Sequence, residues 1–192
     1  MGTWGNDLHK SMDMFDEHII PFLHKLVGKY DEFVRVEGTD EEIAKRLDTQ
    51  AGIDGLIKKN DMHYGLGSRI QVDSGVWPTF TIRCDRESGH ITEFEKLIAA
   101  VKNDAVRPHF TMQAYIVNNE LQAIAMIRTV DLVDYMKYYQ YEIKEKTSYD
   151  KNGWARFKVI RWDDLFRHGY RFVVYQMVNG SLVRTYERKK VA

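Results

Sequence analysis

The chain has 192 residues, of which 44% are hydrophobic and 29% are charged. This length and balance are typical of a globular protein with its own core and exclude a low-complexity or fibrous chain. A single cysteine excludes an internal disulfide, which favours a reducing compartment and an expected cytoplasmic location. No run approaches about 20 apolar residues, so no membrane-spanning helix is expected.

The basic and acidic residues, 28 of each, cancel in number but are unevenly placed. Residues 1–50 carry a net charge of −5, whereas residues 151–192 carry +7. Such asymmetry can give a neutral protein one basic face, which indicates an anionic partner. The alternative is that both ends are solvated or form salt bridges with one another.

Residues 1–28 are expected to form an N-terminal helical segment, helical from residue 6. Pro21 should kink or break this helix near Ile20, and Gly28 should end it. The helix can pack on the chain's own domain or on a second copy, which would make a homodimer. Its apolar stripe recurs every three or four residues at Leu8, Met12, Phe15, Ile19, Phe22 and Leu26.

The central part of the chain alternates helical and strand-like patterns. Two capping boxes, Thr39 with Glu42 and Thr92 with Glu95, each predict the start of a helix. Asn118-Asn119 indicates a hairpin turn. The elements predicted here are a strand or extended segment at 30–36, a helix at 41–49, strands at 52–57, 68–73 and 79–84 with a turn at 60–67, a helix at 92–102, and strands at 110–117 and 121–129.

The last part of the chain is expected to contain one helix at 132–146 and then only strands. Asn179-Gly180 between two alternating runs is the strongest hairpin signal in the chain. The predicted strands are 156–162, 170–178 and 181–188. The order of elements predicts an α/β (α+β) fold, in which a mixed central sheet is flanked by helices and followed by a C-terminal β-hairpin. Residues 1–192 are expected to form a single domain, with a C-terminal β extension at 150–192.

Common catalytic signatures are absent from the sequence. It contains no phosphate-binding GxxxxGK[ST], no GxSxG, no HExxH and no CxxC. The stretch from Leu47 to Asp73 is nevertheless a candidate site, because it places Asp54 and Gln71 on two neighbouring predicted strands. Hard oxygen ligands on adjacent strands suit Mg²⁺ or Mn²⁺ in a hydrolytic site.

The order helix, three strands, helix, strand over residues 39–117 resembles the core of the PD-(D/E)XK nuclease superfamily. Gly52-Ile53-Asp54 followed by Gln71 is similar to the GID…QxK variant of restriction-type and Mrr-like members. The resemblance implies a metal-dependent nuclease that hydrolyses phosphodiester bonds in DNA rather than RNA. It further implies Asp54 and Gln71 as catalytic metal ligands, and Glu42 as a third ligand from the first helix.

The sequence departs from that family at one position. Asp73 stands where the family has the lysine that activates water or steadies the phosphate. In some members this cation is supplied from another strand or from the following helix. The residues expected to replace it are Lys96 and Arg83, with Arg69 as a third candidate on the same face of the strand as Gln71.

Nucleic-acid binding would not depend on catalysis. Arg156, Lys158 and Arg161 alternate with aromatic residues and, together with Arg69, are expected to grip phosphates. The same alternation also fits a half-buried sheet with charges outside. The alternative function is a non-catalytic interaction protein, either a viral or mobile-element inhibitor or a nucleic-acid-binding module, on a nuclease-like or unrelated α/β fold.

Overall fold

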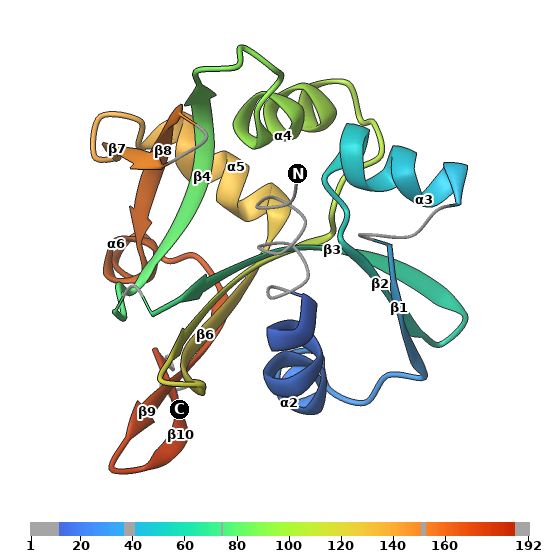
Figure 1. The fold of residues 1–192 in the computed structure, drawn as a ribbon, viewed down its shortest axis with the longest axis vertical. Helices are drawn as coiled ribbons and strands as arrows, with labels where there is room; N and C mark the ends of the chain where they lie inside the picture. Colours follow the sequence, from blue (N-terminus) through green and yellow to red (C-terminus); the bar gives the residue numbers. More distant parts are fainter. Residues whose placement is uncertain (1–11, 37–40, 74, 151–152, 187–192) are drawn as a thin grey trace.

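The computed structural model describes residues 12–36, 41–73, 75–150 and 153–186. Within these residues the strands form two sheets (Figure 1). A mixed sheet of seven strands has the order β1-β2-β3-β5-β6-β9-β10, and an antiparallel sheet of three has the order β4-β8-β7. The expected α/β (α+β) fold with a C-terminal hairpin is therefore confirmed.

The N-terminal helix continues through Pro21 instead of breaking there. A π-helical turn, η1 (Phe15–Ile19), leads directly into α2 (Ile20–Val27), which ends at Gly28 as expected. The wider π turn lies where the proline ring would crowd the preceding carbonyl groups. Met12 is half-buried, and the other described members of the apolar stripe, Phe15, Ile19, Phe22 and Leu26, are buried against the chain's own sheet. They are therefore not available as the homodimer surface that the sequence left open.

The first three strands form an antiparallel meander. The glycine-rich stretch 60–67, expected to be a turn, is instead mostly strand. The turn is confined to Asn60-Asp61, whose φ angles are 50° and 60°. The expected cap Thr39 lies outside the described residues. The elements are β1 (Glu32–Arg35), α3 (Glu42–Arg46), the π-helical turn η2 (Leu47–Ala51), β2 (Gly55–Lys59) and β3 (Met62–Val72).

The chain then leaves the large sheet and returns to it. β4 (Thr79–Arg86) joins the small sheet. The chain therefore differs here from the expected core, in which the third strand lies in the central sheet. α4 (Glu93–Lys102) follows, with the predicted Thr92–Glu95 capping box present. β5 (Phe110–Val117) then pairs parallel to β3, which makes α4 part of the connection between two parallel strands.

Both predicted hairpins are present in the large sheet. Asn118-Asn119 joins β5 to β6 (Glu120–Arg128), and Asn179-Gly180 joins β9 (Phe172–Val178) to β10 (Ser181–Thr185). β9 pairs with β6, so the hairpin extends the sheet. Asn residues in these turns have positive φ, as hairpin turns of this type require.

Two expectations for the C-terminal half are wrong. The helix predicted at 132–146 is α5 (Thr129–Tyr138), and the chain continues into the strand β7 (Lys144–Asp150). The region expected to contain only strands also contains α6 (Trp162–Arg167), which follows β8 (Gly153–Arg161). Trp162 and Leu165 are fully buried, so tertiary packing holds this short helix.

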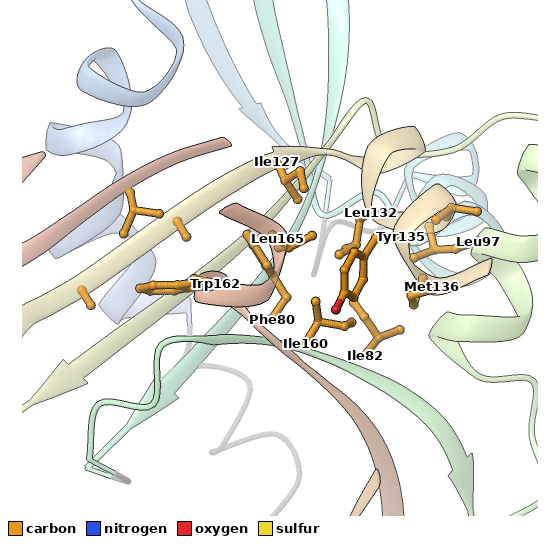
Figure 2. Close-up of a cluster of buried hydrophobic side chains, with 14 of the residues drawn as sticks. Phe80, Ile82, Leu97, Ile127, Leu132, Tyr135, Met136, Ile160, Trp162 and Leu165 are labelled. Carbon is orange, nitrogen blue, oxygen red and sulfur yellow. The ribbon is translucent and has the colours of Figure 1, made fainter. Parts of the chain in front are cut away.

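The large sheet is covered on both faces. The helix α2 covers one face, and α4, α5, α6 and the small sheet cover the other (Figure 1). Figure 2 shows the second of these cores, in which Phe80 and Ile160 of the small sheet meet Trp162, Leu165 and Tyr135. No helix among the described residues is both long and apolar enough to span a membrane.

Candidate functional site

A cleft of about 400 Å³ lies where β2, β3 and β4 approach η2 and α4. It brings together Asp54, Arg69, Arg83 and Lys96, four of the residues predicted from the sequence. We refer to this hollow as the cleft. Its charged side chains are Asp48, Asp54, Arg69, Arg83, Arg86, Glu93 and Lys96.

Asp54 is fixed at the entrance to β2 by Ser68 on the neighbouring strand. One carboxylate oxygen, Oδ2, accepts a hydrogen bond from the Ser68 backbone N–H at 2.5 Å and another from the Ser68 hydroxyl at 3.0 Å. The strands approach closely here because residue 67 is glycine. A Cβ at Gly67 would lie 3.0 Å from the Gly52 carbonyl oxygen and 3.1 Å from Pro108 Cγ.

Arg69 reaches from β3 across to the first turn of α4. Its Nη1 lies 3.6 Å from Oε2 of Glu93, and 25% of the Arg69 side chain and 36% of the Glu93 side chain are exposed. The Arg69 guanidinium also lies 4.5 Å from the centre of the Phe157 ring, a cation–π contact. Desolvation raises the pKa of the Glu93 carboxyl, and the neighbouring Arg69 opposes that rise without cancelling it.

Arg83 enters the cleft from β4 at a break in strand register. The pairing of β4 with β8 shifts between Arg83 and Asp85, and such bulges redirect side chains at sites. The Arg83 guanidinium lies 5.6 Å from the Phe157 ring, on which Arg69 also packs. Its Nε is buried and has no hydrogen-bond partner among the described residues. A buried donor of this kind is suited to receive an anion.

Lys96 extends from α4 toward the same cleft. Burial raises the pKa of Asp48, and the positive charge of Lys96 partly offsets that effect. Arg86 is used structurally, because its Nε and Nη2 donate to the carbonyl oxygens of His90 and Ile91 just before α4. Three further cations, Arg69, Arg83 and Lys96, line the cleft, and of these Arg69 is already paired with Glu93.

The structure does not bring the predicted metal ligands together. Glu42 lies on exposed α3, where 79% of its side chain is accessible and it pairs with Arg46 at 2.7 Å. Gln71 lines a neighbouring hollow, which shares Arg69 and Ile70 with the cleft, and its Nε2 lies 3.4 Å from the Thr81 hydroxyl. Neither residue lines the cleft with Asp54. The described residues also contain no group of three or more His, Cys, Asp or Glu placed to hold a metal.

The predicted nucleic-acid-binding cations of β8 are paired with carboxylates. Arg156 contacts Asp85 at 2.5 Å, and Lys158 contacts Glu145 at 2.9 Å. Arg161 pairs with Asp163 at 3.1 Å. The basic residues that alternate along β8 therefore form ion pairs within the small sheet and beside it. This agrees with the alternative interpretation of the pattern, a half-buried sheet with its charges outside.

Sequence reasoning missed Glu93 and Asp48 as residues of the cleft, and Phe157 as the ring on which Arg69 and Arg83 pack. Glu93 stands immediately after the cap Thr92, and an acidic residue there is ordinarily explained by the helix dipole. No sequence signal joins Phe157 to Arg69, because they are on strands of different sheets. Comparison of the chain with protein-family models, with curated proteins and with solved structures finds no match.

Proposed function

We propose that the protein binds the phosphodiester backbone of a nucleic acid, with DNA the expected ligand, as a binding module on a nuclease-like α/β scaffold. The observation that supports this is the approach of Arg69, Arg83 and Lys96 from three elements to one cleft. Phosphate oxygens accept hydrogen bonds from such cations and give most of the binding energy of nucleic-acid complexes. The buried Nε of Arg83 is the donor that a phosphate oxygen would satisfy.

The test is a binding titration of labelled DNA with the double variant Arg83→Gln, Lys96→Gln. Loss of two phosphate contacts should weaken binding by at least about tenfold and flatten its dependence on salt. The double variant Lys102→Gln, Lys137→Gln is the matched control for charge, because both lysines lie on helices but outside the cleft. Equal affinity of the double variant and the wild-type protein would overturn the proposal.

Metal-dependent hydrolysis of the phosphodiester is a second candidate, favoured by the position of Asp54 beside the same three cations. Only Asp54 of the three predicted Mg²⁺ or Mn²⁺ ligands lines the cleft, so the predicted ligand set does not fit the ion. We therefore propose no hydrolytic step through a metal. Cleavage of DNA that requires Mg²⁺ or Mn²⁺, and that Asp54→Asn abolishes in a folded protein, would establish this candidate. Binding without cleavage would exclude it.

The cytoplasm is the location we propose for this activity. Its support is the single cysteine, Cys84, which leaves the chain without an internal disulfide. Partial burial raises the pKa of the Cys84 thiol, so it is not an activated nucleophile.

A further inference from the structure

A second and larger hollow, of about 1010 Å³, lies around the start of β5, the end of β6 and the start of β9. We refer to it as the groove. The end of α2 and the β2–β3 hairpin border it on one side, and α6 and the end of β10 border it on the other. It shares no lining residue with the cleft. Its volume is at the upper end of the range for ligand pockets, so it has room for an extended ligand.

Aromatic rings line both ends of the groove. Tyr64 and Phe110 are neighbours at one end, with 6.2 Å between ring centres. At the other end Tyr186 packs against both Phe166 and Phe172, with 5.6 Å between ring centres in each pair. All five side chains are half-buried, so the rings keep accessible surface.

A cation lies at the strand ends that the groove borders. Arg128 on β6 is directly opposite Phe110 on β5, and its neighbour Ile127 is opposite Phe172 on β9. Successive strand residues point to opposite faces, so Arg128 lies on the face of Phe110 and Phe172 lies on the other face. The groove, which residues of both faces line, therefore passes around the ends of these strands. Arg171, the residue before β9, adds a second exposed guanidinium.

The lining of the groove is positive. It includes Lys59, Arg128, Arg171 and Arg184 and no aspartate or glutamate among the described residues. Arg128 is held by Asp131, whereas Lys59 donates to a neutral group, the Val27 carbonyl oxygen, at 2.9 Å. The positive charge of Lys59 is therefore not cancelled by that contact.

We propose that the groove binds a single-stranded segment of nucleic acid. Bases would stack on the rings at each end, and the phosphates between them would contact Arg128 and Arg171. Stacking on aromatic side chains combined with cations that follow the backbone is the usual means of holding unpaired strands. A duplex offers no free base face to the rings, so the groove should prefer the single strand. This inference goes beyond the proposed function, because it concerns different residues and requires unpaired bases.

The experiment is fluorescence anisotropy of the full chain with a labelled oligothymidylate of 12 nucleotides. The double variant Arg128→Gln, Arg171→Gln should bind at least about tenfold more weakly, and its salt slope should fall by about 1.4 for two lost phosphate contacts. Arg161→Gln, Arg167→Gln removes the same charge outside the groove and should bind as the wild type does.

The aromatic contribution is measured separately at constant charge. Phe110→Leu and Phe172→Leu should each weaken binding about fivefold or more, because stacking contributes about 1–3 kcal/mol for each base. Tyr141→Leu is the control, because Tyr141 is 95% exposed and lies outside the groove. Circular dichroism and thermal unfolding confirm that each variant is folded before its affinity is compared.

Three outcomes would overturn the inference. The first is unchanged affinity in the folded groove variants, and the second is an equal loss, in these variants, of affinity for the oligothymidylate–oligoadenylate duplex. The third is displacement of the oligonucleotide by polyglutamate at equal charge, which would show that only charge is recognised. The cleft variant Arg83→Gln, Lys96→Gln is measured in the same assay. Loss of single-strand binding in the groove variants and not in the cleft variant supports the groove, and loss in the cleft variant alone overturns it.

Discussion

Arg69 and Glu93 form an ion pair between the large sheet and α4, with 3.6 Å between Nη1 and Oε2. Both groups are partly removed from water, and burial lowers the pKa of Arg69 while it raises that of Glu93. The attraction between the two charges therefore does not fully offset the loss of hydration at either Arg69 or Glu93. A phosphate that enters the cleft would compete with Glu93 for Arg69, which ties the electrostatics of this pair to ligand binding.

The raised pKa of Glu93 predicts a dependence of stability on pH. The folded state holds the Glu93 proton more tightly than the unfolded state does, so this contribution to stability is present below the ordinary value of 4.5 and is lost as the pH rises through the raised pKa. Urea unfolding of the wild type and of Glu93→Gln over this pH range measures the contribution. The free energy of unfolding of the wild type should fall relative to that of Glu93→Gln as the pH rises. A constant difference would contradict the assignment. Glu42→Gln, at an exposed helical position, is the control.

Replacement of Asp54 by alanine should destabilise the protein by about 1–3 kcal/mol. The Ser68 backbone N–H would lose its carboxylate acceptor in a half-buried position, and a polar group left without a partner is costly. Asp13→Ala removes an exposed carboxylate and should change stability by less than about 0.5 kcal/mol. Equal unfolding midpoints for the two variants in urea would show that the Asp54–Ser68 contact contributes little.

Replacement of Thr92 by alanine should lower the free energy of unfolding by about 1 kcal/mol, because it removes the N-cap of α4. The side chain of Glu95 accepts from the Thr92 backbone N–H at 2.8 Å, and the Thr92 hydroxyl accepts from the Glu95 N–H. Thr92→Ser keeps the hydroxyl and should restore most of the loss. Failure of serine to restore stability would indicate that the methyl group, and not the cap, is what matters.

Replacement of Leu165 by alanine should destabilise the protein by about 2–5 kcal/mol, as expected for a fully buried leucine in a packed core. Leu165 anchors α6 beneath the small sheet, next to Phe80 and Trp162 (Figure 2). Ile43→Ala at a 75% exposed position is the matched control and should change little. Chemical denaturation followed by tryptophan fluorescence compares the two variants. A small effect at Leu165 would mean that α6 contributes little to the core.

Local signals in the sequence were reliable where one short segment contains its own stabilising contacts. The turns at Asn118-Asn119 and Asn179-Gly180 and the cap at Thr92 were all predicted correctly. Each depends on backbone angles or hydrogen bonds within a few residues, so no distant part of the chain can change them. The glycines of 60–67 led to the wrong prediction of a turn, because the conformation of this segment is not decided by local contacts. Their strand conformation depends on pairing with β2 and β5.

The candidate site was predicted in part. Asp54, Arg69, Arg83 and Lys96 were identified as individual residues and do share one cleft. Glu42 and Gln71 were added from a family pattern, and the structure places them elsewhere. Their positions depend on how α3 is turned and on how the small sheet packs against β3. Neither relationship is encoded in local spacing.

The fold class, the central and C-terminal hairpins, and the capped helix that carries Lys96 were all predictable from local patterns in the sequence. Packing between distant segments places β4 outside the large sheet and brings Arg83 and Arg69 to the same Phe157 ring. It also decided that the N-terminal stripe is buried in the chain's own core. The physical reason is that periodicity defines which face of an element is apolar, whereas the surface that covers that face is chosen by packing between segments distant in the chain.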